Sequence, residues 1–308
     1  MNIEVFLTEA EIAQEFTESI EARDLAEKFF YWFPRSVRAW LELSQNAVTA
    51  SLRQCWDGLS GANARHIAGD ADATVSVISF GSGDGVKDRM LIRALVQGGR
   101  SVKYFPVDAS QTLLELACSA AEDAEIETTG IKADISSPMH LVLASDAAES
   151  PKIFLMAGNS LGGFDPLDQV RHLAECMHSE DRLIIDGEIF NEAVLARGED
   201  PCVRKFALAP LATVGVSEDD GELHFEHKRD ERHSGLHLIT RFFRAGRDLT
   251  LTLPGDPTLP RGERVFLNFR YTYTAESFRW LLAKHAGLRI VEDVRSPDGQ
   301  AIAAVCSR

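Results

Sequence analysis

The sequence predicts an α/β protein built on a doubly wound, mostly parallel β-sheet. Segments typical of buried strands alternate with segments of helical periodicity along much of the chain. The clearest alternation runs from Val75 to Ser110, where a strand, a glycine-rich loop, a helix, a second strand and an acid follow one another. That order is the front half of a nucleotide-binding βαβ unit. We therefore expect a ligand site beyond the carboxyl ends of these strands.

Each element of this unit has its own signal. The largely apolar segments Val75–Phe80 and Val102–Val107 predict the two strands, and the second strand ends at Asp108. Between them, Met90-Leu91 and Ala94-Leu95 recur at helical spacing. Glycines allow the loop backbone to pass close to a ligand, and an acid at the strand tip can accept both hydroxyls of a ribose.

The glycine spacing narrows the choice of ligand. A dinucleotide site needs G-x-G-x-x-G, which would place its third glycine where this chain has Val86. The spacing Gly81-x-Gly83-x-Gly85 suits a ligand without a pyrophosphate, such as S-adenosylmethionine. The alternative is a purely structural turn between strand and helix.

Composition excludes several classes of function. The chain has 308 residues and a net charge of −15, which argues against a nucleic-acid or anionic-membrane partner. No apolar run reaches the length of a membrane span, and the N-terminus is acidic rather than signal-like. The five cysteines are dispersed, as expected for reduced thiols in a cytoplasmic protein. A homodimer is compatible with this composition.

Residues 8 to about 68 predict helices. Thr8 is a cap for the first of these, which we expect to continue to Phe30, and Pro34 interrupts the helical pattern. The segment Lys28–Phe33 is unusually aromatic. It either packs the N-terminal helices against the rest of the protein or forms a lid over a ligand.

Further strands and helices follow the opening unit. We expect them over residues 110–122 (helix), 130–135 (strand), 152–157 (strand), 165–177 (helix) and 182–186 (strand). Asp134 and Asn159 lie, like Asp108, where a predicted strand ends, so they are candidates for the same ligand site. A helix cap or surface turn is the alternative for Asp134.

The last third of the chain changes character. Residues 204–262 predict a β-rich segment with a hairpin turn at Glu218–Gly221 and strands in GELHFEH, HLITRFF and DLTLTL. Its histidines lack the spacing of a zinc site, so we expect a solvated hairpin and no metal. A strand over Val265–Tyr273, a helix from Thr274 to Gly287 and a terminal hairpin then return to the core. The predicted segments are 1–70 (helical cap), 71–190 (ligand-binding core), 191–262 (β-rich insertion) and 263–308 (last core elements).

GSGDGVKDR and YFPVDAS together resemble the cofactor site of the histidine-specific N-methyltransferases of ergothioneine biosynthesis. Gly81, Lys87 and Asp108 fall on positions of that motif. The resemblance extends over most of the chain from about residue 26, including residues 133–135, residues 153–166 and, more weakly, residues 28–31. It implies an S-adenosylmethionine-dependent methyltransferase of class I, with a Rossmann-like sheet of seven strands that ends in an antiparallel hairpin.

The resemblance also implies roles for individual residues. The cofactor-binding residues would be Gly81, Ser82, Gly83, Lys87, Asp108, Ala109, Asp134, Ile135, Asn159 and Ser160. Tyr31 and Asn159 would be the catalytic residues. The residues that bind the acceptor would be Tyr31, Gly163, Phe164, Asn268 and Arg270.

The acceptor residues are also where this chain departs from the family. Gly163 replaces an Asn that holds the amino-acid carboxylate, and Asn268 and Arg270 replace the Glu and Ser that hold the imidazole. No Tyr lies between residues 187 and 205, and the Tyr-Tyr-Pro-Thr-Arg stretch of the family is absent. Arg270 either contacts the acceptor or is an exposed strand residue.

We therefore expect methylation of a nitrogen or oxygen atom of a small molecule other than free histidine. The alternatives are a methyltransferase-like protein that binds a nucleoside without catalysis and a dinucleotide-dependent oxidoreductase.

Overall fold

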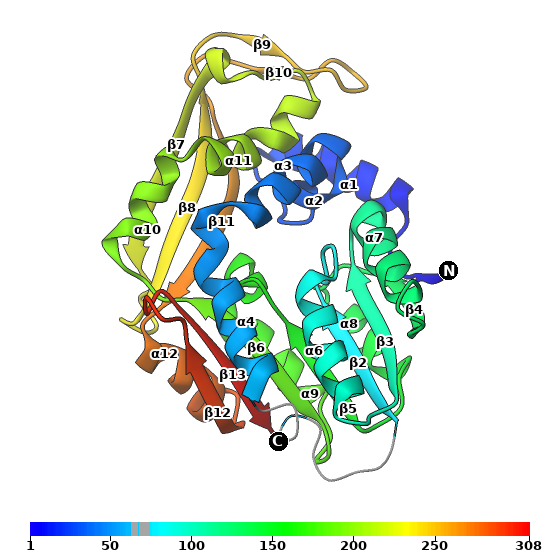
Figure 1. Ribbon diagram of the computed structural model, residues 1–308. Coiled ribbons are helices and arrows are strands. Elements are labelled where there is room, and N and C mark those ends of the chain that lie inside the picture. Colours follow the sequence, from blue (N-terminus) through cyan, green and yellow to red (C-terminus); the bar gives the residue numbers. More distant parts are fainter. Residues whose placement is uncertain (63–66, 68–73) are drawn as a thin grey trace. The chain divides into compact units, whose positions relative to one another are not determined.

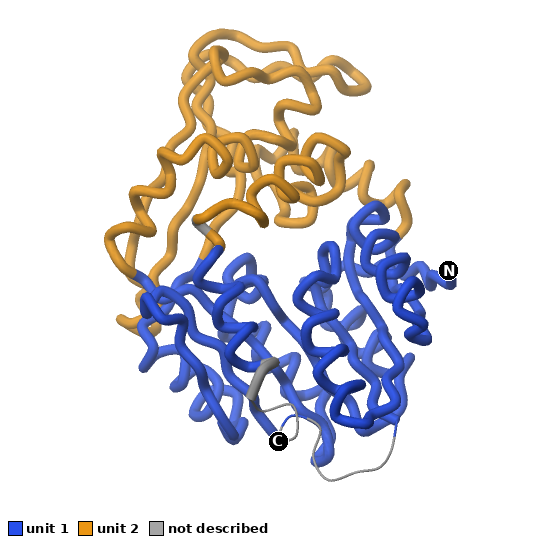
Figure 2. The backbone as a smooth tube through the Cα atoms, viewed as in Figure 1, with its two compact units in different colours: residues 1–7, 50–190, 271–308 blue, residues 8–49, 191–270 orange. Residues whose placement is uncertain are grey.

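The computed structural model describes residues 1–62, 67 and 74–308. By its internal contacts the chain divides into two compact units, which Figure 2 shows in different colours. Unit 1 comprises residues 1–7, 50–190 and 271–308, and unit 2 comprises residues 8–49 and 191–270. The four consecutive segments expected from sequence remain a prediction, and their boundary at residues 70/71 lies outside the described residues.

Unit 1 is built on one large sheet (Figure 1). Its strands among the described residues are β1 (Asn2–Val5), β2 (Val75–Phe80), β3 (Val102–Asp108), β4 (Glu127–Lys132), β5 (Lys152–Met156), β6 (Arg182–Glu188), β12 (Arg289–Arg295) and β13 (Ala301–Ser307). They are ordered β1-β4-β3-β2-β5-β6-β13-β12. Neighbours from β1 to β6 are parallel, and β13 is antiparallel to both β6 and β12. The predicted mostly parallel sheet with a terminal antiparallel hairpin is confirmed.

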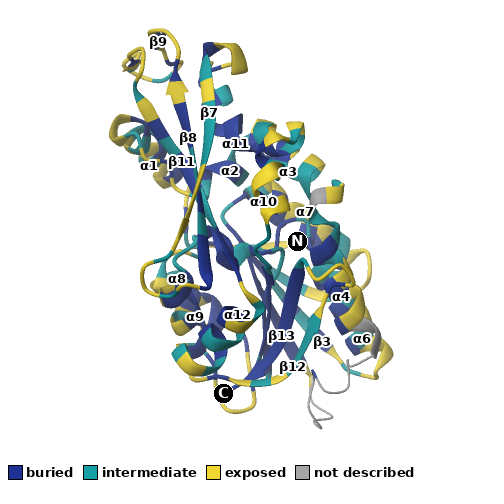
Figure 3. Cartoon of the chain, turned by 90° about the vertical axis from the view of Figure 1, so that its left-hand side faces the viewer, coloured by how far each residue is buried: buried dark blue, intermediate teal, exposed yellow. Residues whose placement is uncertain are grey.

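Helices cover both faces of this sheet. They are α4 (Ala50–Ala62), α6 (Val86–Gln97), α7 (Gln111–Glu122), α8 (Pro138–Asp146), α9 (Pro166–Glu175) and α12 (Ala275–Trp280). Figure 3 shows α4, α6 and α7 on one face and α8, α9 and α12 on the other. Every residue of β2 and β13 is buried because both faces are covered, which explains their continuous apolar sequences.

The strand order locates a switch point in the sheet. From β2 the chain adds β3 and β4 on one side, and it later adds β5 and β6 on the other side. The loops that follow β2 and β5 therefore leave neighbouring strands at the same edge of the sheet. Ligands of doubly wound sheets bind at this kind of position.

Unit 2 combines helices with smaller sheets. Its helices are α1 (Glu9–Ala22), α2 (Phe29–Trp32), α3 (Pro34–Gln45), α10 (Glu192–Ala196) and α11 (Pro201–Thr213). Its strands are β7 (Gly221–Arg229), β8 (Leu236–Ala245), β9 (Leu249–Thr250), β10 (Thr258–Leu259) and β11 (Arg264–Tyr273), whose last three residues belong to unit 1. These strands form a sheet of order β11-β8-β7 and a separate β10-β9 pair.

The aromatic segment before Pro34 forms part of the core of unit 2. Phe29 and Phe30 are fully buried. The ring of Phe29 packs edge-on against Phe16 of α1, with 5.0 Å between the centroids. The ring of Phe30 lies 5.6 Å from that of Phe206 in α11. These two phenylalanines therefore hold α1, α2 and α11 together.

Four local predictions were wrong in the boundaries or the position of an element. The first helix ends at Ala22, before the predicted end, because Arg23 adopts a left-handed conformation with φ of 59°. Strand β4 ends at Lys132, since Asp134 turns the chain by accepting a hydrogen bond from the Ser136 amide. The turn of the β7–β8 hairpin lies at residues 230–235, and residues 218–220 form a 3-10 turn that leads into β7. Only Leu249–Thr250 of the predicted strand DLTLTL is a strand.

Two predictions about the sheets were also wrong. The large sheet has eight strands among the described residues rather than seven, because the short, mostly exposed β1 adds to its edge beside β4. The strand at Val265–Tyr273 does not join this sheet, since β11 pairs with β8 of unit 2. Its alternating pattern fits either sheet, and strand pairing over long distances cannot be read from a local pattern.

Candidate functional site

The glycine loop lies at the carboxyl end of β2. The amides of Gly81 and Ser82 both donate to the carbonyl of Val107 in β3, at 2.8 and 3.1 Å. Gly81 has a φ of 72°, and a Cβ atom there would lie 3.2 Å from Ile135 Cδ1 and 3.3 Å from Ser160 Oγ. Glycine is therefore required at this position. The same contacts show that the loops after β2, β4 and β5 converge here.

Asp108 ends β3 beside this loop and is almost fully buried. Its Oδ2 accepts the amide of Gly83 at 2.9 Å, and its Oδ1 accepts the amide of Ser110 at 2.9 Å. Burial raises the pKa of Asp108 to about 6, although the hydrogen bonds from Ser110 and Gly83 oppose the rise. The Ala109 amide also opposes this rise as a hydrogen-bond donor to the carboxylate. A carboxylate has about four acceptor sites, so a ligand donor such as a hydroxyl group can still bind here.

Ser82 adds a buried polar group to the same loop. Its Oγ atom has no hydrogen-bond partner among the described residues. A buried hydroxyl without a partner costs free energy, and a ligand that hydrogen-bonds to it would remove that cost. This position therefore favours a polar ligand over an empty structural turn.

Asp186 in β6 organises the loop that follows β5. Its side chain is fully buried and accepts the amides of Gly158 and Asn159 at 2.8 and 2.6 Å. It also accepts the indole N–H of Trp56 in α4 at 2.6 Å. Burial raises its pKa, and the charge of Lys87 opposes that rise. We did not identify Asp186 or Trp56 from the sequence, because the two residues lie 130 positions apart.

Lys87 reaches the same loop from the first turn of α6. A Cβ atom on Gly158, which has a φ of 83°, would lie 3.1 Å from Lys87 Nζ. The ammonium group therefore passes close to the backbone at the switch point. Its positive charge faces the side chain of Asp186.

Asn159 is buried and adopts a left-handed conformation with φ of 56°. Its Nδ2 atom donates to the carbonyl of Tyr271 at 3.2 Å, and its Oδ1 accepts the amide of Glu188 at 3.4 Å. Both polar atoms thus bond to the main chain of unit 1. These contacts position the loop, and the predicted catalytic role of Asn159 stays a prediction.

The other predicted cofactor residues surround these groups. Ala109 directly follows Asp108, and Ser160 Oγ donates to the carbonyl of Ala157 at 2.7 Å. The carbonyl of Ile135 accepts Gln169 Nε2 at 2.8 Å. Asp134 Oδ1 accepts both the amide and the hydroxyl of Ser136, at 2.9 and 2.6 Å, so this oxygen closes a turn.

The predicted acceptor residues belong to different units. Gly163 is buried at the end of a 3-10 helix (Ser160–Gly163) in unit 1, and Phe164 follows it, half-buried. Tyr31, Asn268 and Arg270 belong to unit 2.

The predicted acceptor-binding residues of unit 2 lie around a carboxylate that we did not identify from the sequence. Glu27 accepts the hydroxyl of Tyr31 at 2.9 Å through Oε1 and Asn268 Nδ2 at 2.8 Å through Oε2. Burial raises the pKa of Glu27, and the charge of Arg270 is the largest influence that opposes this rise. Arg270 is half-buried, so it is not a fully exposed strand residue.

Two histidines of the β7–β8 hairpin, His227 and His237, pair with each other. Nε2 of His227 lies 3.0 Å from Nδ1 of His237, and burial lowers the pKa of His237 to about 4. In the described part of the chain, no group of three or more His, Cys, Asp or Glu side chains is arranged to hold a metal ion. None of the helices in that part is long and apolar enough to cross a membrane.

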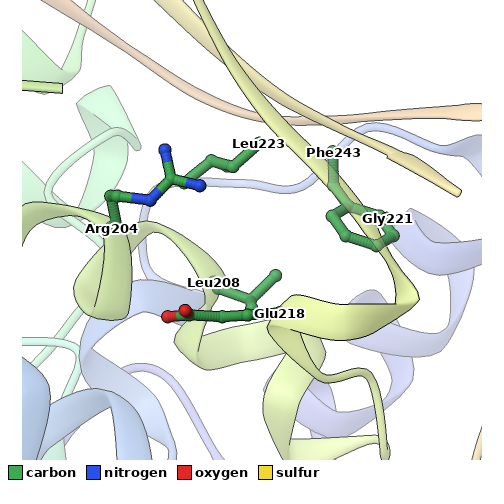
Figure 4. Close-up of a pocket in the computed structure, with 6 residues that line it drawn as sticks. All are labelled: Arg204, Leu208, Glu218, Gly221, Leu223 and Phe243. Atoms are coloured by element: carbon green, nitrogen blue, oxygen red, sulfur yellow. The ribbon is translucent and has the colours of Figure 1, made fainter. Parts of the chain in front are cut away.

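Figure 4 shows a pocket in unit 2. It is lined by Arg204, Leu208, Glu218, Gly221, Leu223 and Phe243. None of the predicted site residues lines it.

Comparison with known families decides the class of the protein. Residues 59–308 match the profile of the family described as histidine-specific methyltransferase, SAM-dependent. The chain belongs to this family. The matched region contains the glycine loop, Asp108 and the loop after β5, but it does not reach Tyr31, whose assignment stays a prediction.

Comparison with solved structures finds methyltransferases of low sequence identity to this chain. Magnesium protoporphyrin IX methyltransferase from Synechocystis PCC 6803, solved with bound SAH, is 14% identical, with a TM-score of 0.49 over 91% of this chain and 97% of that one. A S-adenosylmethionine-dependent methyltransferase from Clostridium acetobutylicum ATCC 824 is 12% identical, with a TM-score of 0.47 over 88% and 98% of the two chains. No curated protein matches by sequence.

As a member of this family, the protein is a methyltransferase that uses S-adenosylmethionine. The residues at the switch point fit this cofactor, because they combine a glycine cradle, a buried hydroxyl in need of a partner and an acid with unused acceptor capacity. We propose that Gly81, Ser82 and Gly83 contact its amino-acid part and that Asp108 accepts its ribose hydroxyls.

We expect Asp186→Asn to weaken the binding of S-adenosylhomocysteine about tenfold. Asparagine has one acceptor oxygen, so at least one of the amides of Gly158 and Asn159 would lose its partner, at a cost of about 1–3 kcal/mol. Isothermal titration calorimetry measures the change. The matched control is Asp181→Asn. Asp181 is also fully buried, but it accepts the Lys152 amide at the opposite end of β5. Equal losses of affinity in the two variants would contradict a specific role for Asp186.

Proposed function

We propose that this methyltransferase transfers a methyl group to a nitrogen or oxygen atom of a small molecule that carries an anionic group. The observation that supports this proposal is the pair of guanidinium groups around Glu27. Arg270 of β11 and Arg241 of β8 both act on the charge of Glu27. Both side chains are positively charged, and a guanidinium fork suits a carboxylate or phosphate.

The chemistry requires little more of the protein than binding and alignment. S-adenosylmethionine supplies the reactive methyl group, which is transferred by an in-line displacement. The protein must hold the acceptor close to this methyl group and keep water away. No covalent nucleophile or metal is needed for these steps.

Aromatic side chains provide a wall for the proposed acceptor site. The ring of Tyr31 lies 6.2 Å from that of Trp40 and 5.6 Å from that of Phe206. These contacts fix the position of the Tyr31 ring, and its hydroxyl is directed to Glu27.

We further propose that the protein is cytoplasmic. Its cysteines are unpaired in the structure, and three of them, Cys55, Cys118 and Cys306, are buried. Buried thiols that form no disulfide are typical of a reducing compartment.

A screen of acceptors tests the proposed function. The protein is incubated with methyl-labelled S-adenosylmethionine and small molecules grouped by charge, and methylated products are identified by mass spectrometry. We expect products from compounds that carry a carboxylate or phosphate. Products from cationic compounds alone would contradict the proposal.

We expect free histidine not to be methylated efficiently in the same assay. A guanidinium has no acceptor atom for an imidazole N–H, and the Oδ1 of Asn268 already accepts from Arg241. A site whose buried polar groups are left unpaired rejects a ligand by a large factor. Trimethylated histidine formed at the rate of the best acceptor would show this prediction to be wrong.

A further inference from the structure

Glu27 lies where several elements of unit 2 meet. It belongs to the segment between α1 and α2, its Oε1 accepts from Tyr31 of α2, and its Oε2 accepts from Asn268 of β11. Asn268 is almost fully buried, and its own Oδ1 accepts Nη1 of Arg241 in β8 at 3.4 Å. The carboxylate is therefore held in a defined position by side chains from α2 and β11, and Arg241 of β8 holds Asn268 in turn.

These contacts hold the carboxylate in place, but they do not fully offset the free-energy cost of burying its charge. The pKa of Glu27 remains raised despite the hydrogen bonds from Tyr31 and Asn268 and the charges of Arg270 and Arg241. A carboxylate has about four sites for hydrogen bonds, and the contacts to Tyr31 and Asn268 use two of them. A further donor would stabilise the ionised form. A bound ligand with an O–H or N–H group can provide that donor.

The charges around Glu27 restrict the ligand further. Among the charges that oppose the raised pKa of Glu27, that of Arg270 has the largest effect. A ligand that contacts both side chains must present a hydrogen-bond donor to Glu27 and an anionic group to Arg270.

We infer that Glu27 determines the specificity of the acceptor site. It accepts a hydrogen bond from a hydroxyl or amino group of the acceptor, while the anionic group of the acceptor binds Arg270. This inference rests on the proposed function and adds the second recognition element of the acceptor. It assigns that element to the N-terminal segment, outside the residues 59–308 that match the family.

Paired carboxylates test the inference. Benzoate is compared with para-hydroxybenzoate and para-aminobenzoate, and acetate with glycolate and glycine, by calorimetry on the full chain saturated with S-adenosylhomocysteine. In the wild-type protein, we expect the compounds with a donor to bind about tenfold to a hundredfold more tightly than their partners. Glu27→Gln should remove this preference while the protein still binds the carboxylates. The side-chain amide oxygen of the variant can still accept the hydroxyl of Tyr31, which helps to preserve the fold.

The control is Glu263→Gln. Glu263 also forms a contact within unit 2, a 3.0 Å ion pair with Arg23. It takes no part in the hydrogen bonds that join Glu27, Tyr31, Asn268 and Arg241. This variant should keep the wild-type preference, and thermal unfolding verifies that both variants are folded. If the wild-type protein binds both members of each pair equally, the inference about Glu27 is wrong and the anionic acceptor stands. If it binds none of these compounds, the proposed anionic acceptor fails and the inference fails with it.

Discussion

Asp108→Asn is expected to weaken the binding of S-adenosylhomocysteine about tenfold to a hundredfold at neutral pH. The carboxylate is held by the amides of Gly83 and Ser110, so it can accept ribose hydroxyls without moving. Hydrogen bonds to a charged group contribute about 1.5–3 kcal/mol. Calorimetry measures the loss. The control is Asp84→Asn, which removes one negative charge from the same loop. The Oδ1 atom of Asp84 accepts the Val86 amide. This variant should bind S-adenosylhomocysteine as tightly as the wild-type protein does.

The raised pKa of Asp108 adds a dependence on pH. Below about 6 its carboxyl is protonated and presents a donor where the ribose needs an acceptor, so affinity should fall as the pH falls through this value. Ligand hydroxyls favour the ionised form, so binding near pH 6 should release part of a proton. Calorimetry in two buffers of different ionisation enthalpy measures this release. If Asp108→Asn releases the same amount, another group titrates and Asp108 is only the end of a strand.

The position of the loops that we propose for the cofactor was predictable because their signals are local. A strand that runs into Gly81-x-Gly83, and a second strand that ends at Asp108, have nearly the same geometry in every parallel sheet. The sequence therefore placed these residues correctly at the switch point. The strand before Asp134 ends earlier than predicted, at Lys132, so Asp134 lies in the turn that follows the strand and accepts the Ser136 amide there.

The rest of the site depends on contacts between distant residues. Trp56 and Asp186 are 130 positions apart, and Glu27 and Asn268 are 241 apart. No periodicity or motif marks such pairs, since each residue alone resembles an ordinary helix, strand or loop residue. A buried acid within the strand Arg182–Glu188 was the one available signal for Asp186, because a charge there needs partners. Glu27 lies in an irregular segment that has no comparable signal.

Arg270→Gln is expected to raise the KM for the acceptor about a hundredfold and to leave the binding of S-adenosylhomocysteine unchanged. The proposed cofactor contacts come from the glycine loop and Asp108, whose positions are fixed by hydrogen bonds within unit 1, so they should remain intact. Loss of one partner from a desolvated charge pair costs about 2–5 kcal/mol. The acceptor is the best substrate of the labelled-methyl screen, and steady-state kinetics separate KM from kcat.

Two further variants determine which property of Arg270 matters. Arg270→Lys keeps the charge but loses the planar fork, so it should restore part of the affinity if the anion is held by two parallel hydrogen bonds. Arg264→Gln, at an exposed position of the same strand paired with Glu226 at 3.5 Å, should have a KM close to that of the wild type. The loss of Arg270 also removes the main charge that opposes the raised pKa of Glu27, so this carboxyl should protonate at higher pH in Arg270→Gln. An unchanged KM in Arg270→Gln would place the anionic group of the acceptor elsewhere.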